Sequence, residues 1–285
     1  MKANKKVLRS GLLMLLTPFI LWIGMLVVLP HIELLRISFI GHRTGTFTVT
    51  NYTNFFTNPL YRNTYIRSAI FSILVTLITL VISFPIAFFI TKVVGPKASG
   101  ILMLIIILPF WISELIQAFA WMIMLRETGI ISYLLQALGI VSHNVELLYN
   151  DAAIMVGLVY TSLLFMLVPI VSTLSTLDDN IIEAAYDLGG NFWNILFEVI
   201  IPYSAPGIAT GCIMVFMLSL GNYISVTLLG GKDSLWFTEQ IYNQFILRFN
   251  WNQGAAFGIL LLILSSLIVW VGLKVSGQEL EEVLK

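Results

Sequence analysis

The chain has 285 residues, of which 58% are hydrophobic and only 11% are charged. Its mean hydropathy of +0.94 exceeds what the core of one water-soluble domain accommodates. The 15 basic and 15 acidic residues cancel, so no net charge attracts nucleic acid. These values predict an all-α integral membrane protein whose main surroundings are the lipid bilayer.

Windows of about 20 apolar residues, the length that crosses the hydrocarbon of a bilayer, recur along the chain. We expect one transmembrane domain over 1–285, with six helices near 10–30, 69–91, 100–125, 152–175, 204–230 and 254–275. The first window is longer than the apolar part of a signal peptide, and no small-residue cleavage site follows Pro30. We therefore interpret it as a retained anchor.

Basic residues before the first window predict that the N-terminus lies in the cytoplasm. They are Lys2, Lys5, Lys6 and Arg9. An even number of spans returns the C-terminus to the same side, which predicts an N-in, C-in topology. Lys92 and Lys97, between the second and third spans, agree with this orientation. Residues 178–203, between the fourth and fifth spans, contain no Lys or Arg. The topology therefore depends on the N-terminus and on the number of spans.

This 178–203 segment is polar and predicts a structured element at the cytoplasmic surface. Asn180 is expected to cap a helix whose third residue is Glu183, with the Glu183 carboxylate reaching back to the cap amide. The pair Gly189–Gly190 is expected to end that helix, because glycine adopts left-handed backbone angles without strain. A second short helix is expected to begin near Asn191, and Pro202 to break the chain before the fifth span.

The same segment resembles the cytoplasmic loop that is characteristic of ABC-importer permease subunits. The pattern is Glu-Ala-Ala, three residues, Gly, nine residues, then aliphatic, any residue, aliphatic and Pro. It is matched by Glu183, Ala184, Ala185, Gly189, Val199, Ile201 and Pro202. Other stretches resemble the first permease subunit of spermidine/putrescine importers, over most of residues 10–272: Leu108–Trp111, Gly157–Tyr160, Pro206–Ile208 and Gly254–Gly258.

This resemblance implies a type I ABC importer permease fold in a multi-pass protein of the bacterial inner membrane. It also implies an assembly with a second homologous permease subunit, two ATP-binding-cassette subunits and an external substrate-binding protein. The chain contains no Gly-x-x-x-x-Gly-Lys-Ser/Thr phosphate loop. We therefore expect no catalytic residue and no cofactor on this chain, with ATP and Mg²⁺ bound by the partner ATPase subunits.

The resemblance further implies that the 178–203 segment is a coupling helix that docks into a groove of the ATPase subunit. Small and apolar side chains would make the contact, the glycine would permit the turn, and the glutamate would organise the helix or meet a basic partner residue. The residues expected to serve this coupling are Glu183, Ala184, Ala185, Leu188, Gly189 and Pro202. A purely structural surface helix is the alternative.

An acidic residue within an apolar span, Glu114, predicts part of a substrate pathway, because a carboxylate in a membrane is costly without a partner. Helical spacing places it on one face with an amide and two indole rings, a group that suits an alkylammonium ion. The pathway candidates are Trp111, Glu114, Gln117, Trp121, Tyr160, Ser219, Asn222 and Tyr223. Packing or hydrogen bonding between helices is the alternative role for each of them.

We therefore expect a permease that moves spermidine, putrescine or a related small organic cation inward. A permease of the same family for an opine, iron(III), thiamine or a phosphonate is one alternative. An independent ion-coupled carrier or channel is another, which accounts for Glu114 but leaves the 178–203 segment without a role. The three histidines are dispersed and no His-Glu-x-x-His occurs, so neither a metal site nor an intramembrane metalloprotease is expected.

Overall fold

The computed structural model describes residues 15–276. Regular structure in this part of the chain is helical, apart from an isolated bridge between Ile40 and Phe47, which confirms the all-α fold. Six helices are long and apolar enough to cross a membrane: Leu15–Ser38, Pro59–Val93, Glu114–Ala137, Asp151–Ser175, Phe192–Gly221 and Trp251–Lys274. The N-terminal basic residues lie outside the described residues, and the N-in, C-in orientation stays a prediction.

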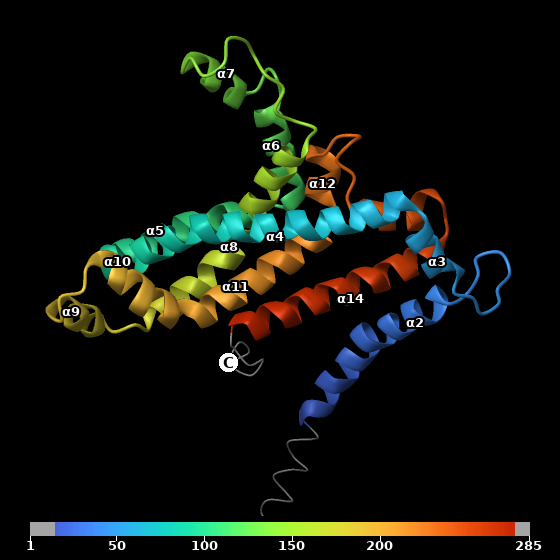
Figure 1. Cartoon of the computed structure of the whole chain (residues 1–285), viewed down its shortest axis with the longest axis horizontal. Helices are drawn as coiled ribbons and strands as arrows, with labels where there is room; N and C mark the ends of the chain where they lie inside the picture. The colour runs from blue at the N-terminus through green and yellow to red at the C-terminus, as the bar shows by residue number, and fades with distance from the viewer. Residues whose placement is uncertain (1–14, 277–285) are drawn as a thin grey trace, which may run out of the picture. The chain divides into compact units, whose positions relative to one another are not determined.

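The helices follow one another along the chain, and the longest connections are residues 39–49 and 138–150 (Figure 1). In chain order the α-helices are α2 Leu29–Ser38, α3 Thr50–Thr57, α4 Pro59–Phe88, α5 Pro96–Ile107, α6 Glu114–Leu125, α7 Ile130–Ala137, α8 Asp151–Ser175, α9 Asp179–Asp187, α10 Phe192–Ile195, α11 Ile201–Gly221, α12 Ile224–Leu229, α13 Phe237–Tyr242 and α14 Trp251–Ser276. Wider π-helical turns are η1 Gly24–Val28, η2 Phe89–Val93, η4 Leu196–Ile200 and η5 Asn243–Leu247, and η3 Leu108–Trp111 is a 3₁₀ turn.

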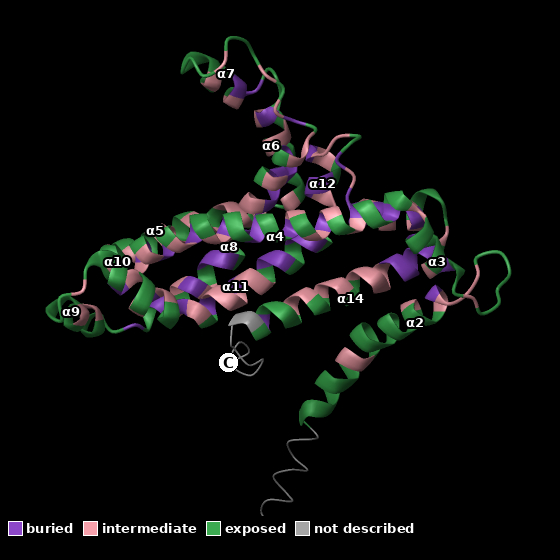
Figure 2. Cartoon of the chain, viewed as in Figure 1, coloured by how far each residue is buried: buried purple, intermediate pink, exposed green. Residues whose placement is uncertain are grey.

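One compact unit combines the described residues up to Arg62 with Gln240–Ile263. Side-chain amides hold it together, since Asn51 Nδ2 donates to the Ser38 carbonyl at 2.8 Å and Gln253 Nε2 donates to the Asn51 carbonyl at 2.6 Å. These bonds tie the end of α2 to α3 and to the first turn of α14. The helix that contains α2 is exposed over most of its length (Figure 2).

The second compact unit combines Asn63–Glu239 with the described residues from Leu264 onward, and it contains both candidate sites. Its core lies where α4, α8 and α11 pack together, and α8 contributes a row of fully buried aliphatic side chains. That row is Ile154, Leu158, Met166, Leu167, Ile170 and Leu174. The recurrence of these positions at intervals of about one helical turn explains why one face of α8 is buried.

Two glycines on α11 set its distance from α8. A Cβ atom at Gly207 would lie 2.6 Å from the carbonyl oxygen of Pro169, and one at Gly211 would lie 2.7 Å from the sulfur of Met166. Without side chains at these positions, the two helix backbones approach closely, as is common where dispersion contacts drive packing in membranes. The α8–α11 contact therefore leaves no room for a side chain at either glycine.

The predicted single helix over 100–125 is divided in the structure. Helix α5 ends at Ile107, the 3₁₀ turn η3 follows, and α6 begins only at Glu114. Pro109 lies within η3, and the backbone of Ile112, which follows η3, is extended, with φ −83° and ψ 139°. Pro109 cannot donate the hydrogen bond that would continue an α-helix, and its ring crowds the preceding turn. The apolar window is long enough for one span but contains two helices.

The predicted span over 204–230 is divided as well. Helix α11 ends at Gly221, Asn222 is extended with φ −70° and ψ 130°, and α12 begins at Ile224. The Gly-Asn pair is a turn signal that favours this break. Two interruptions of apolar helices are therefore present in the same unit, one before α6 and one before α12.

Gly207→Ala tests the close approach of α8 and α11. The new methyl group overlaps a backbone carbonyl, which cannot rotate away, so we expect the free energy of unfolding to fall by about 1–3 kcal/mol. Thermal unfolding of the purified protein in detergent measures this as a lower midpoint. Gly100→Ala in α5 is the matched control, because a Cβ there meets nothing within 4 Å. Equal midpoints for the two variants would contradict the packing role of Gly207.

Candidate functional site

Residues 178–203, predicted to couple the chain to an ATPase subunit and called the coupling segment below, begin with a helix whose start differs from the prediction. Asp178 is the N-cap of α9, with extended backbone angles, and its Oδ1 accepts from the amide of Asn180 at 3.0 Å. The predicted cap at Asn180 is wrong, because Asn180 already lies inside the helix. An ionised Asp at the cap also complements the positive end of the helix dipole. Glu183 consequently lies too far from the cap to complete a capping box.

The end of α9 is a Schellman motif, which confirms the predicted stop at Gly189–Gly190. The amide of Gly189 donates to the carbonyl of Tyr186 at 2.9 Å, and that of Gly190 donates to the carbonyl of Ala185 at 3.1 Å. Gly189 has φ +85°, a left-handed conformation that other residues adopt only with strain. Backbone geometry therefore fixes where the chain turns after α9.

The second short helix begins as predicted, because Asn191 Oδ1 accepts from the amide of Asn194 at 2.9 Å and caps α10. The predicted break at Pro202 is wrong. Helix α10 continues through the π-helical turn η4 into α11, and Pro202 lies in the first turn of α11. The wider turn just before a proline relieves the crowding of its ring against the preceding turn. One uninterrupted span, Phe192–Gly221, therefore leaves the coupling segment.

The coupling segment exposes large apolar side chains. Leu188 is 89% exposed, and the rings of Trp193 and Phe197 are exposed and stack with centroids 6.2 Å apart. Glu183 and Ala184 are exposed too, whereas Ala185 is only partly exposed and packs against the chain's own core. Apolar residues surrounded by acidic ones form a surface suited to a partner protein with apolar and basic groups.

The second candidate site lies where the two interrupted helices meet. Asn222 Nδ2 donates to Glu114 Oε1 at 2.5 Å, and Asn222 Oδ1 accepts from the amide of Ser225 at 2.9 Å. Glu114 is the first residue of α6, and Asn222 precedes α12. The carboxylate is therefore held between two helix starts, where the exposed amides favour negative charge. Both residues were predicted as pathway candidates, but their pairing was not predicted.

Gln117 has a structural part in this arrangement. Its Nε2 donates to the carbonyls of Pro109 and Ile112, both at 3.0 Å. These carbonyls belong to the break before α6, where that of Pro109 keeps only the 3₁₀ bond from the Ile112 amide at 3.2 Å. Thr238 Oγ1 likewise donates to the carbonyl of Asn222 at 2.9 Å, at the other break. Buried side chains thus satisfy the backbone groups that the interruptions release.

A cavity of about 800 Å³ borders the Glu114–Asn222 pair. It combines polar groups with aromatic rings, and its lining includes Phe110, Trp111, Glu114, Gln117, Thr161, Ser162, Phe165, Asn222 and Tyr223. Five of the predicted pathway residues are therefore brought together: Trp111, Glu114, Gln117, Asn222 and Tyr223. Phe110, Thr161, Ser162 and Phe165 were missed. The last three lie on α8, a different span from Glu114, whereas the spacing of Phe110, four residues before Glu114, could have found it.

The remaining pathway candidates lie outside this lining. Tyr160 stacks on Phe110 with ring centroids 6.1 Å apart and meets Trp121 edge to face at 5.5 Å. Ser219 is fully buried in α11. Trp111 does not share a helix with Glu114, so the single helical face predicted for these residues is wrong. Trp111 reaches the cavity from the 3₁₀ turn instead, and its side chain is 85% exposed.

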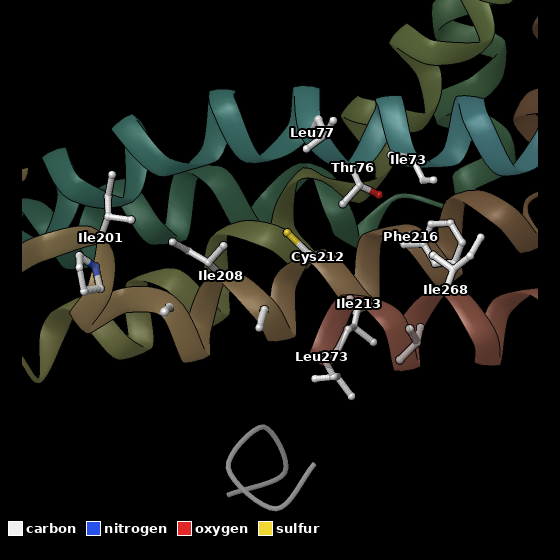
Figure 3. Close-up of a pocket in the computed structure, with 15 residues that line it drawn as sticks. Ile73, Thr76, Leu77, Ile201, Ile208, Cys212, Ile213, Phe216, Ile268 and Leu273 are labelled. Carbon is white, nitrogen blue, oxygen red and sulfur yellow. The ribbon is translucent and has the colours of Figure 1, made fainter. Parts of the chain in front are cut away.

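Another cavity of about 600 Å³ has a different chemistry (Figure 3). Its walls are apolar side chains of α4, α11 and α14, such as Leu77, Ile208 and Leu273. The hydroxyl of Thr76 in its wall already donates to the carbonyl of Ser72 at 2.8 Å. A cavity of this kind offers nothing to a charged cargo. Among residues 15–276, no group of His, Cys, Asp and Glu could hold a metal ion.

Comparison with known proteins places this architecture in a family. Residues 83–276 match the family model described as "Binding-protein-dependent transport system inner membrane component". The spermidine/putrescine transport system permease protein PotB of Haemophilus influenzae is 35% identical over 255 residues, covering 88% of each chain. The protein of the same name from Escherichia coli is 32% identical, covering 88% of this chain and 92% of its own.

Solved structures share the fold. A bacterial alginate ABC transporter, in complex with an alginate pentasaccharide-bound periplasmic protein, aligns with a TM-score of 0.78 and 19% identity, covering 97% of both chains. The methionine ABC transporter MetNI aligns with a TM-score of 0.55, over 74% of this chain and 93% of its own. The chain therefore belongs to the family of binding-protein-dependent transport system inner membrane components and is a multi-pass inner membrane permease with the type I ABC importer fold.

Proposed function

We propose that this chain is the permease subunit of an ATP-driven importer that carries a polyamine, spermidine or putrescine, or a related small organic cation. The observation that carries the proposal is its similarity to PotB, at 35% identity over nearly the whole of both chains. The cavity at Glu114 supports the same cargo, because it joins a carboxylate to aromatic rings in an otherwise apolar membrane protein.

The chemistry of this cavity matches that of a polyamine. Such a molecule alternates protonated amines with short methylene chains. The Glu114 carboxylate would accept a charge-assisted hydrogen bond from an ammonium group. The ring of Phe110 and the exposed indole of Trp111 would contact the methylenes and the adjacent charge. The bond from Asn222 keeps the carboxylate satisfied while no cargo is present. An anionic cargo, such as a phosphonate, is disfavoured by the same carboxylate.

Energy for transport would come from partner subunits. We propose that the coupling segment docks on an ATP-binding-cassette subunit through Leu188, Ala184 and the exposed aromatic pair. Its acidic residues would face basic groups there. Two such subunits would bind ATP and Mg²⁺, a second homologous permease would complete the pathway, and an external binding protein would deliver the cargo. In this arrangement the coupling segment would face the cytoplasm, in agreement with the predicted N-in, C-in topology.

Transport that depends on ATP distinguishes this proposal from an independent ion-coupled carrier. We expect proteoliposomes with the assembled complex, loaded binding protein and internal ATP to accumulate labelled spermidine. Proteoliposomes with this chain alone should not, with or without an ion gradient. Uptake by the isolated chain at the rate of the complex would favour the carrier and overturn the proposal.

Leu188→Glu tests the docking surface. A buried leucine contributes about 1.5–3 kcal/mol to an interface, and a carboxylate in its place adds a desolvation penalty. We expect much less ATPase subunit to copurify with the variant, and the stimulated ATPase activity to fall with it. Leu138→Glu is the matched control, because Leu138 is also strongly exposed and precedes a glycine with positive φ. Normal copurification with Leu188→Glu would remove Leu188 from the interface.

Glu114→Gln tests the pathway. The amide keeps the shape of the side chain but removes its charge, and a hydrogen bond to a charged group contributes about 1.5–3 kcal/mol. We expect uptake of spermidine at low concentration to fall roughly tenfold or more, with normal expression and assembly. Glu127→Gln, at an exposed acidic position, is the control and should retain uptake. Unchanged uptake by Glu114→Gln would return Glu114 to a purely structural role.

A further inference from the structure

Lys92 is a cation with a nearly buried side chain at the end of a long helix. It lies in η2, which continues α4, and its side chain is only 7% exposed. Lys97, the other lysine of the same connection, is exposed. A lysine side chain normally extends into water, because its ammonium group is strongly hydrated. Lys92 therefore needs partners within the protein.

Its partners are the end of α8 and the beginning of α9. Lys92 Nζ donates to the carbonyl of Leu177 at 2.5 Å and to Asp179 Oδ1 at 2.7 Å. Leu177 follows the last turn of α8, where exposed carbonyls favour a positive charge. Asp179 is the first residue of α9. One ammonium group thus connects α4 with the connection that leads from α8 into the coupling segment.

A second contact joins the same end of α4 to the coupling segment. The rings of Phe88 and Phe192 meet edge to face with centroids 6.3 Å apart, and Phe192 is the first residue of α10. The connection is also held from α11, because the hydroxyl of Tyr203 donates to the carbonyl of Thr176 at 3.1 Å. Both short helices of the coupling segment are therefore linked at their starts to the end of α4.

We infer that Lys92 is a positioning residue for coupling, which transmits displacement of α9 to α4. The inference rests on the proposed function, because it assumes that α9 is moved by an ATPase subunit. Lys92 touches neither cargo nor nucleotide. It acts by holding the start of α9 to the rest of the unit, so that docking at Leu188 moves helices instead of only bending the 176–179 connection. This role requires the charged contact between Lys92 and Asp179, whereas simple apolar packing of the Lys92 side chain would not.

The test uses the complete complex of both permeases, ATPase subunits and loaded binding protein in proteoliposomes. The variants are Lys92→Met, which keeps the length of the side chain without its charge, Lys92→Arg, which keeps the charge, and Asp179→Asn. Lys97→Met is the control for loss of a cation from the same connection. The readouts are spermidine taken up per ATP hydrolysed, and ATPase activity with and without loaded binding protein.

We expect Lys92→Met to lower uptake per ATP roughly tenfold, within the range of coupling between distant sites, while basal ATPase activity is retained. Lys92→Arg should restore much of the ratio, Asp179→Asn should lower it less than Lys92→Met, and Lys97→Met should match the wild type. An unchanged ratio in Lys92→Met would overturn the inference. If that variant fails to assemble, Asp179→Asn tests the inference instead. The Asp179 side chain is 75% exposed, and its substitution leaves the bond from Lys92 to the Leu177 carbonyl in place. An unchanged ratio there would also overturn it.

Failure of the proposed function has a different signature. In that case the wild-type complex itself takes up no spermidine and shows no stimulation by loaded binding protein. A wild-type complex that transports normally, beside Lys92 variants that transport equally well per ATP, refutes only the role of Lys92.

Discussion

A polypeptide in a bilayer must satisfy its backbone hydrogen bonds within the protein, and the candidate cargo site depends on how this chain meets that requirement. Two apolar helices are interrupted, before α6 and before α12. Gln117 and Thr238 donate hydrogen bonds to backbone carbonyls at these interruptions. The same interruptions bring Glu114 and Asn222 together. Local loss of helix is thus what permits a polar, partly aromatic cavity in a protein that is otherwise apolar.

The two candidate sites are connected by one helix. The span Phe192–Gly221 starts in the coupling segment, passes Pro202 without a break and ends beside Asn222. Along its length, Gly207 and Gly211 hold it against α8, which itself leads into α9. Interiors packed at high density resist continuous deformation, so under the proposed function we expect such a pair to move as a body. Displacement at the coupling segment therefore has a physical route to the Glu114 cavity.

Local features of the coupling segment were predictable from sequence, whereas contacts between distant residues were not. The Gly189–Gly190 stop and the Asn191 cap follow from backbone preferences of single residues. The cap at Asp178 was missed because Asp and Asn are equally good caps, and only tertiary structure decides between neighbours. The Glu114–Asn222 bond joins residues 108 positions apart, which no local pattern reveals. In the sequence, Lys92 indicates only which side of the membrane its connection faces. Its partners Leu177 and Asp179 are apparent only in the folded structure.

The interruption at 108–113 was hidden for a related reason. Hydropathy windows measure apolar length, and both α5 and α6 are apolar, so such a window does not detect the helix break at Pro109.

The apolar cavity between α4, α11 and α14 has a practical consequence of its own. The only cysteine of the chain, Cys212, lies in its wall, on the helix that joins the two sites. Since thiols react as thiolates and need water for that, alkylation of Cys212 is a native reporter of whether this wall opens as α11 moves.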